Sequence, residues 1–246
     1  MLRMLYLIYY CLIVVPLFFV ATIITALTVM IGCLLGGEKF FAFYPGMIWS
    51  RFVCSLALCP VKIKGKENLQ KGQSCIFVAN HQSAFDIFLI YGYLGVPIKW
   101  MMKIELAKVP FVGAACRAAG FVFVDSSSAR AAHRSIAEAE HRLKDGASLA
   151  VFPEGSRTYD GKIARFRKGA FQIANDLKLP IVPITLNGPY KVLPIGSALA
   201  HPHRMEMVIH PPISVRKANE LNSGSLQTLA DHTKSIISSA LWNEFK

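Results

Sequence analysis

The pattern of hydrophobic positions divides the chain near residue 60. Before that point, two long apolar runs cover Met4–Leu35 and Phe40–Cys59, separated by two glycines and a charged pair. After it, short apolar runs of strand length alternate with stretches whose apolar residues recur at helical spacing. We therefore predict two regions: a hydrophobic membrane anchor over residues 1–59 and a catalytic domain over residues 60–246.

The first apolar run is long enough to cross a lipid bilayer. Met4–Leu35 contains 32 residues and no charge, whereas about 20 apolar residues span a hydrocarbon core. It is also too long for a signal peptide, whose apolar part covers about 7–15 residues before a cleavage site. We therefore predict a helical anchor that the protein keeps.

The second apolar run leaves two arrangements open. Phe40–Cys59 carries one charge, Arg51, and begins with aromatic residues beside the polar break, a composition typical of a membrane interface. One arrangement is a spanning helix followed by an interfacial helix. The other is a helical pair that enters one leaflet and returns. The sequence is compatible with both.

Seven short runs after residue 60 have the length and pattern of β-strands. They are Val61–Lys64, Ser74–Ala79, Ile98–Met102, Phe121–Val124, Ser148–Phe152, Ile181–Leu186 and Met205–Ile209. Helical patterns occur at Ala84–Tyr93, Ala129–Lys144, Ala170–Leu177 and Leu226–Trp242. The alternation predicts an α/β fold, a layered domain with a mostly parallel central sheet flanked by helices. Active sites in such sheets lie at the carboxyl ends of strands.

Charge and cysteine content narrow the class of protein. The chain is 53% hydrophobic, which excludes disorder, and residues 60–246 carry a net charge of +10, which favours an anionic membrane surface as a partner. A nucleic-acid binder is the usual alternative for a basic protein, but no motif supports one, so no nucleic acid is predicted. The six cysteines form no C-x-x-C pair, which argues against a metal site and indicates a reducing compartment.

The first candidate site is the junction between the strand that ends near Asn80 and the helix that follows. His81 and Asp86 are five residues apart and on one helix would lie about 140° from each other. They can meet if His81 stays in the loop while Asp86 lies in the first helical turn. Asp86 would then hold one imidazole nitrogen and leave the other as a general base. In the alternative, Asp86 satisfies amides of the first turn and His81 is a turn residue.

The second candidate site lies where the strand Ser148–Phe152 runs into Pro153. Glu154 and Arg157 project just beyond this strand, and Gly155 permits a tight turn between them. The planar guanidinium of Arg157 suits bidentate binding of a phosphate. In the alternative, this segment is a solvated basic loop in which Glu154 pairs with Arg157.

Together these motifs resemble the glycerolipid acyltransferase family, most closely its members that act on 1-acylglycerol-3-phosphate. Four blocks carry the resemblance in family order: Asn80–Asp86, Lys103–Gly113 with Gly120–Phe123, Phe152–Arg157 and Val182–Ile184. The resemblance covers roughly residues 60–215. The paired apolar N-terminus also resembles bacterial members, in which a two-helix element anchors the enzyme.

The resemblance implies direct transfer of an acyl chain from a thioester of acyl carrier protein or coenzyme A to the free hydroxyl of 1-acylglycerol-3-phosphate. The product would be phosphatidic acid, in phospholipid biosynthesis. The implied roles are His81 and Asp86 as catalytic residues, and Glu154, Gly155, Arg157 and Lys103 as substrate-binding residues. No cofactor or metal is implied. The catalytic domain is expected on the cytoplasmic face of a membrane, which in a bacterium is the inner membrane.

Two alternatives stay open. The family's second block commonly has Arg after the Asp, whereas here Asp125 is followed by Ser126 and the nearest arginine is Arg130. Another lysolipid, such as an amino-acid-headed one, is therefore the alternative acceptor. A serine hydrolase using Ser156 is the second alternative, although the residues around it do not form the G-x-S-x-G turn of such enzymes.

Overall fold

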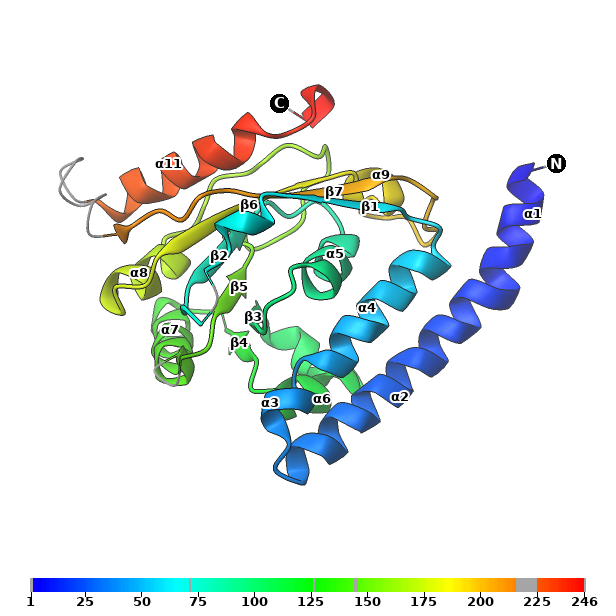
Figure 1. Cartoon of the computed structure of the whole chain (residues 1–246), viewed down its shortest axis with the longest axis horizontal. Helices are drawn as coiled ribbons and strands as arrows, with labels where there is room; N and C mark the ends of the chain where they lie inside the picture. Colours follow the sequence, from blue (N-terminus) through cyan, green and yellow to red (C-terminus); the bar gives the residue numbers. More distant parts are fainter. Residues whose placement is uncertain (1, 71, 126, 144–145, 216–224, 246) are drawn as a thin grey trace.

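Seven strands form one sheet, with helices on both of its faces (Figure 1). The computed structural model describes residues 2–70, 72–125, 127–143, 146–215 and 225–245. The strands are β1 (Val61–Lys64), β2 (Ile76–Ala79), β3 (Lys99–Lys103), β4 (Val122–Val124), β5 (Leu149–Val151), β6 (Ile181–Asn187) and β7 (Met205–Ile209). Their order across the sheet is β1-β7-β6-β2-β5-β3-β4. All seven strands predicted from the sequence are present.

Most neighbouring strands run parallel. β2 pairs in parallel with β5 and β6, and β3 pairs in parallel with β4 and β5. β6 and β7 form the antiparallel pair among the described strands, and β1 joins β7 in parallel at one end of the sheet. The predicted, mostly parallel α/β sheet is confirmed. Because β2, β5 and β3 are neighbours that share one direction, their carboxyl ends meet along one edge.

Helices cover both faces of the sheet because its central strands are buried on both sides. In β2, Ile76 and Val78 belong to one apolar cluster, whereas Phe77 and Ala79 belong to the other. The first cluster includes side chains of α7 (Ala129–Leu143), α8 (Gly169–Asp176) and α11 (Leu226–Ser239). The second includes side chains of α4 (Tyr44–Leu56) and α5 (Phe85–Tyr93). The four helices predicted after residue 60 are therefore present.

Several short elements have no counterpart in the sequence prediction. They are the helices α6 (Val112–Ala118) and α9 (Pro189–Val192) and the 3-10 turns η2 (Lys66–Asn68), η3 (Ile104–Lys108) and η4 (Asn243–Phe245). Segments this short hold too few apolar positions to show a period. Two of them, η3 and α6, connect β3 to β4, and α6 packs against α2.

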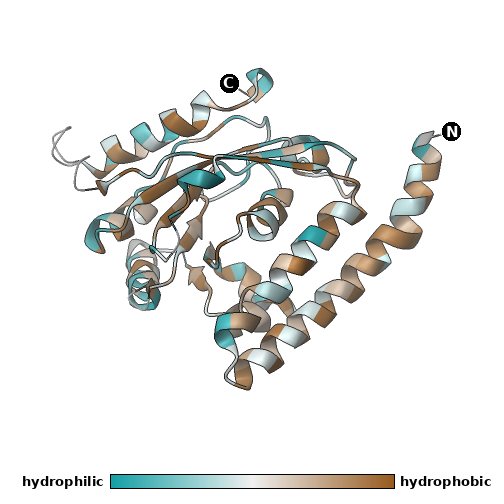
Figure 2. Cartoon of the chain, viewed as in Figure 1, coloured by the Kyte–Doolittle hydropathy of each residue, from teal (hydrophilic) through white to brown (hydrophobic). Residues whose placement is uncertain are grey.

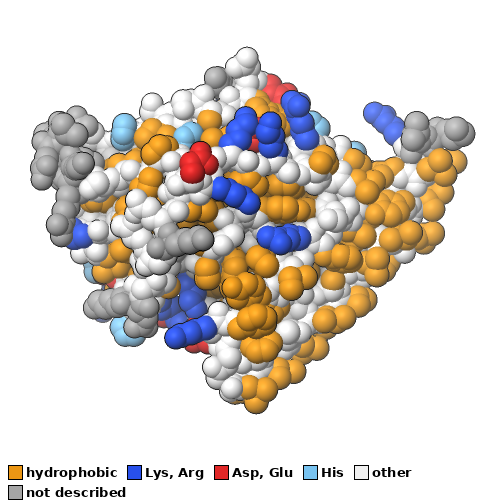
Figure 3. Space-filling model, in the orientation of Figure 1, with side chains coloured by type: hydrophobic (Ala, Val, Ile, Leu, Met, Phe, Trp, Pro, Cys, Tyr) orange, Lys and Arg blue, Asp and Glu red, His pale blue; other side chains and the backbone are white. Residues whose placement is uncertain are grey.

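The first apolar run forms one long helical stretch. It consists of α1 (Leu2–Tyr9), a π-helical segment η1 (Tyr10–Val14) and α2 (Val15–Leu34). The part from Arg3 to Leu34 is long and apolar enough to cross a membrane, and little of its most apolar window is buried inside the protein. Figure 2 shows its hydrophobic character, and Figure 3 shows hydrophobic side chains along its surface. This exposed apolar helix is a candidate membrane anchor.

The second apolar run forms a short helix, α3 (Glu38–Phe41), and then α4. α4 packs against α2 on one side and against α5 on the other. Gly46 makes this approach possible, because a Cβ atom at that position would collide with the ring of Tyr91. The Tyr91 hydroxyl donates a hydrogen bond of 2.7 Å to the carbonyl of Ala42. Buried side chains from both predicted regions thus share one cluster, and the boundary after residue 59 stays a prediction.

Candidate active site

The two junctions singled out in the sequence meet at the carboxyl edge of the sheet. Since β2 and β5 are adjacent, the loop after Ala79 lies beside the loop after Val151. The backbone N–H of His81 donates to Oε1 of Glu154 at 2.7 Å, and the backbone N–H of Thr158 donates to the carbonyl of His81 at 3.2 Å. Segments about seventy residues apart therefore form one site.

His81 and Asp86 are in direct contact, in the arrangement that their spacing allows. His81 lies in the loop and Asp86 in the first turn of α5, and Nδ1 of the imidazole is 2.8 Å from Oδ2 of the carboxylate. The same oxygen accepts the backbone N–H groups of Gln82 at 2.6 Å and Ser83 at 2.7 Å. Asp86 is fully buried. It therefore binds the backbone of the loop that precedes α5 as well as the imidazole.

This contact fixes which imidazole nitrogen carries the proton. A carboxylate oxygen accepts hydrogen bonds, so Nδ1 of His81 is the donor and Nε2 is left as an acceptor. The ring also stacks on Phe152, with centroids 4.0 Å apart and planes 8° apart. Trp100 stacks on Phe152 in turn, at 5.6 Å. The position and plane of the imidazole are held by one hydrogen bond and one aromatic face.

Glu154 is buried, and both of its oxygens accept backbone hydrogen bonds. Oε1 accepts from His81, and Oε2 accepts from the N–H of Ala164 at 2.7 Å. Burial raises the pKa of this carboxyl group to about 7, although the two backbone donors act in the opposite direction. Glu154 forms no ion pair with Arg157 in the described structure, so the solvated-loop alternative does not describe it.

Gly155 allows a close approach at the turn beyond β5. Its φ of 79° lies in the left-handed region, and a Cβ atom there would be 2.8 Å from Cζ of Arg167. The backbone N–H of Arg167 donates to the carbonyl of Pro153 at 2.9 Å. The group that approaches this glycine is thus a guanidinium of the same chain, and the predicted contact of Gly155 with substrate stays a prediction.

Two cations at this edge are available to an anion. Arg157 and Lys103 are exposed, and neither side chain forms an ion pair or hydrogen bond with a residue that the structure describes. Lys103 is the last residue of β3, which runs beside β5 in the same direction.

Ser156 is also exposed, and within the described residues its hydroxyl makes no hydrogen bond to His81. Among the residues that the structure describes, no group of three or more His, Cys, Asp or Glu side chains could hold a metal ion.

Comparison with known proteins places this site in a family. A family model described as Acyltransferase matches residues 60–187, which include the candidate residues His81, Asp86, Lys103 and Glu154 to Arg157. The chain belongs to the acyltransferase family. A chloroplastic 1-acyl-sn-glycerol-3-phosphate acyltransferase of Brassica napus is 35% identical over 171 residues, 69% of this chain and 49% of the relative. The chain therefore spans about half the length of that relative.

Two bacterial proteins extend the comparison. The 1-acyl-sn-glycerol-3-phosphate acyltransferase of Pseudomonas aeruginosa is 31% identical over 66% of this chain and 64% of its own length. A crystal structure of a 1-acyl-sn-glycerophosphate acyltransferase from Thermotoga maritima is similar to this chain with a TM-score of 0.82. That comparison is 27% identical and covers 99% of this chain and 100% of the other. The likeness therefore includes the N-terminal helices.

The structure adds residues that sequence reasoning did not select. Phe152 lies inside a recognised block, yet its contact with the imidazole depends on the adjacency of β2 and β5. Trp100 supports it from β3. The backbone N–H of Ala164, which holds Glu154, carries no side-chain signal at all. The position of Phe152, an aromatic residue immediately before the Pro153–Gly155 turn, is the one sequence feature that points to a contact with the imidazole.

Proposed function

We propose that the chain transfers an acyl group from a thioester to the free hydroxyl of 1-acylglycerol-3-phosphate, forming phosphatidic acid. The observation that carries the proposal is the His81–Asp86 pair at the carboxyl edge, with Nδ1 bound at 2.8 Å and Nε2 left as an acceptor. The names of the relatives supply the acceptor, since those from Brassica napus and Pseudomonas aeruginosa are both called 1-acyl-sn-glycerol-3-phosphate acyltransferases.

The chemical step needs one base. Nε2 of His81 takes the proton of the acceptor hydroxyl while its oxygen attacks the thioester carbonyl. The Nδ1 hydrogen bond to Asp86 stabilises the imidazolium that forms. The new ester C–O bond forms, the C–S bond breaks, and the sulfur leaves as a thiolate that takes up a proton. Because a thiolate is a good leaving group, the reaction proceeds without a separate catalytic acid.

Substrate binding in this proposal uses the two exposed cations. Arg157 grips the acceptor phosphate through its planar fork, and Lys103 adds a second charge from the end of β3. Glu154 acts through the backbone of His81. Its carboxylate accepts hydrogen bonds from the N–H groups of His81 and Ala164, and these bonds fix the loops that position the acceptor hydroxyl at the imidazole. Gly155 keeps the turn free of a side chain beside the substrate.

The lipid nature of the substrates fits a membrane location. We propose that residues 1–59 form the anchor and residues 60–246 the catalytic domain, which lies on the cytoplasmic face. The donor is a thioester of acyl carrier protein or coenzyme A, and the net charge of +10 on residues 60–246 favours either acidic carrier. The exposed apolar helix from Arg3 to Leu34 supports the anchor.

The decisive experiment is an acyl-transfer assay of the full chain with a panel of acceptors and donors. We expect turnover with lysophosphatidate, release of free thiol in equal amount, and no thiol release without an acceptor. His81→Ala serves as the inactive control. Turnover with an amino-acid-headed lysolipid but not with lysophosphatidate would replace the acceptor in this proposal. Thiol release independent of any acceptor would indicate a hydrolase.

A further inference from the structure

Exposed apolar side chains outside the N-terminal helices concentrate in one short segment. After Leu58, the described residues include five exposed large hydrophobic side chains. Four of them lie between β3 and α6: Ile104, Leu106, Val109 and Phe111, which are 39–48% exposed. We call these four side chains the apolar edge. A soluble surface rarely gathers its exposed apolar groups in this way, so the apolar edge is expected to meet a partner.

The segment that carries the apolar edge is rigidly attached to α6. The carbonyl of Ala107 accepts a hydrogen bond of 2.9 Å from Nη2 of Arg117. Gly113 lies directly beneath that carbonyl, where a Cβ atom would collide with it. The N–H of Gly113 also donates to the carbonyl of Val109 at 2.9 Å. The exposed side chains are therefore presented by an ordered surface.

Backbone strain at Phe111 supports a functional reason for this exposure. Its φ of 61° lies in the left-handed region, which a bulky side chain rarely adopts. Such a conformation costs on the order of 1–3 kcal/mol. The phenylalanine is 48% exposed, so burial within this chain recovers only part of that cost. Strain of this kind is typical of sites that bind something else.

The position of the apolar edge identifies the partner as a lipid surface. α6 packs directly against α2, the candidate anchor, and Figure 1 shows α6 beside α2 and α3. The outer face of α2 is itself apolar, with residues such as Ile24, Ile31 and Leu34 exposed. The two apolar surfaces thus neighbour each other through α6. Two exposed lysines, Lys103 and Lys108, flank the central part of the edge, as in segments that lie in an anionic membrane interface.

We propose that the apolar edge is a second membrane contact, which inserts its four side chains into the lipid interface beside α2. The contact would hold the carboxyl edge of the sheet at the membrane surface, because the apolar edge begins at Ile104, directly after Lys103, the last residue of β3. It rests on the proposed membrane attachment of α2 and is independent of whether acyl transfer is the reaction.

Contact quenching by brominated lipids tests the insertion directly. Leu106→Trp places an indole on the apolar edge of the full chain, and His232→Trp places one on the exposed side of α11, across the sheet. Both are reconstituted in phosphatidylcholine–phosphatidylglycerol vesicles with and without bromine on the acyl chains. Emission is compared with that of the natural chain, which has three tryptophans. This readout needs no turnover, so its failure is distinguishable from failure of the proposed reaction.

For Leu106→Trp we expect roughly a two-fold or greater quenching of the added emission, since apolar groups of interfacial segments reach the acyl boundary. His232→Trp should show none. High salt should leave the quenching in place because apolar insertion is not screened. An unquenched indole at position 106, or equal quenching at both positions, would overturn the proposal. The proposal would also be overturned if the emission of the indole at position 106 changed with protein concentration but was not quenched by the brominated lipids. That result would assign the apolar edge to contact with a second copy of the chain. Val109→Trp replaces Leu106→Trp if the latter lowers the Tm.

A polar variant separates membrane contact from a structural role. Phe111→Gly combined with Leu106→Asn removes apolar contact, and glycine adopts a positive φ such as that at position 111 without a Cβ clash. We expect acyl transfer to lysophosphatidate in vesicles to fall by roughly ten-fold as apolar contact is lost. Transfer to the same acceptor in detergent micelles should stay near that of the natural chain. An equal loss in both would show that the edge matters for folding rather than for the membrane, and would overturn the proposal.

Discussion

The two edges of the central sheet differ in a way that locates the chemistry. At the carboxyl edge, His81, Asp86 and Glu154 are packed closely, and the hydrogen bonds that the two carboxylates accept are 2.6–2.8 Å long. At the amino edge, the structure has a cavity of about 880 Å³. This cavity therefore lies at the edge of the sheet opposite His81.

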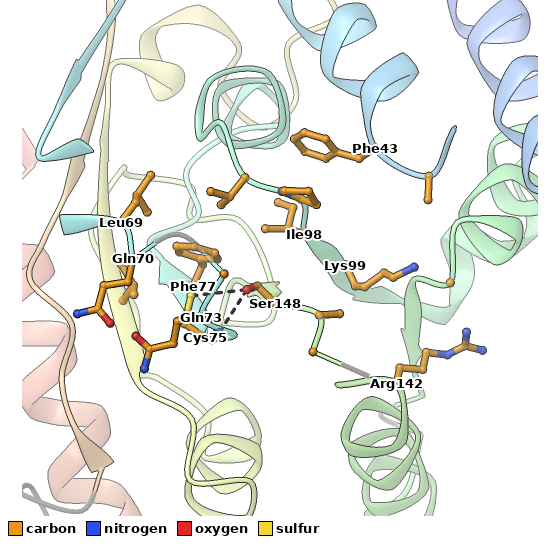
Figure 4. Close-up of a pocket in the computed structure, with 18 of the residues that line it drawn as sticks. Phe43, Leu69, Gln70, Gln73, Cys75, Phe77, Ile98, Lys99, Arg142 and Ser148 are labelled. Atoms are coloured by element: carbon orange, nitrogen blue, oxygen red, sulfur yellow. Dashed lines mark hydrogen bonds between the residues drawn. The ribbon is translucent and has the colours of Figure 1, made fainter. Parts of the chain in front are cut away.

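The cavity at the amino edge has apolar walls, and two of the cations that line it are in ion pairs. Figure 4 shows Phe43, Phe77 and Ile98 on its walls, with Lys99 and Arg142 extending outward. Lys99 pairs with Glu38 at 2.8 Å, and Arg142 pairs with Glu138 at 2.7 Å. The cations at the carboxyl edge, in contrast, have no such partners among the described residues.

This contrast is a reason to propose the carboxyl edge as the reactive site. At the amino edge, the ends of strands and helices leave a hollow, and Lys99 and Arg142 there are already in ion pairs. At the carboxyl edge, a buried carboxylate directs one histidine nitrogen and leaves the other available, beside cations that are not neutralised. Directional hydrogen bonds and unpaired charge, rather than volume, therefore identify the candidate active site.

The largest expected effect comes from removing the base at the carboxyl edge. His81→Ala should lower kcat by about 100- to 10,000-fold, the usual contribution of a general base. Asp86→Asn should lose much of the same activity, and the double variant should lose less than the product of the two single losses, because the pair acts as one unit. Steady-state kinetics with protein of normal Tm measures this. Near-normal turnover of His81→Ala would move the chemistry away from this edge.

The next effect concerns the stability that buried Glu154 contributes. Its pKa is about 7 in the folded chain against an ordinary value of 4.5, so the folded state binds this proton more tightly than the unfolded state. The stabilisation is complete below pH 4.5 and is lost as the pH rises through about 7. The loss should be on the order of 3 kcal/mol.

The measurement compares the natural chain with Glu154→Gln. Urea titrations at several pH values give the free energy of unfolding of both proteins. As the pH rises from 4.5 through about 7, the free energy of unfolding of the natural chain should fall relative to that of Glu154→Gln. The variant has no titrating group at this position and is the matched control. A difference that is flat with pH, or that shifts in favour of the natural chain, would contradict the raised pKa.

Replacing Arg157 should weaken binding of the acceptor more than binding of the donor. Arg157→Lys keeps the charge but loses the planar fork, so about 1.5–3 kcal/mol of a charged hydrogen bond should be lost. The KM for lysophosphatidate should rise while the KM for the acyl thioester stays close to its original value. Adding Lys103→Met should make the defect much larger. A change confined to the thioester KM would assign Arg157 to the donor instead.

Breaking an ion pair at the amino edge should have a far smaller effect than breaking the pair at the carboxyl edge. Glu38 is exposed and its partner Lys99 is half-buried, so Glu38→Gln should cost at most about 1 kcal/mol of folding stability. Thermal unfolding measures this change. The kcat should remain that of the natural chain, because the pair lies far from His81. A loss of kcat comparable with that of Asp86→Asn would mean that the amino edge takes part in the reaction.

The smallest effect is expected from Ser156→Ala. The serine is exposed and makes no hydrogen bond to His81 in the described structure, so no acyl-enzyme should form there. Activity should remain, and mass spectrometry of a quenched reaction should find Ser156 unmodified. A trapped acyl group on this serine would favour the hydrolase alternative.

The sequence alone determined the elements whose signals are local. Each of the seven strands is a short apolar or alternating run, and the long apolar stretch before Gly36 predicts the helix that ends at Leu34. The five-residue spacing of His81 and Asp86 left open whether the two side chains touch, but it limited such a contact to one loop-and-helix arrangement, which the structure contains. Such features depend on residues within a few positions of each other.

The tertiary structure decided everything that depends on which strands are neighbours. The adjacency of β2 and β5 brings Glu154 to the backbone of His81 and Phe152 to its ring, across about seventy residues. The packing of α6 on α2 sets the apolar edge beside the anchor. Neither follows from periodicity, because the order of strands in a parallel sheet is set by long-range packing that no local segment records.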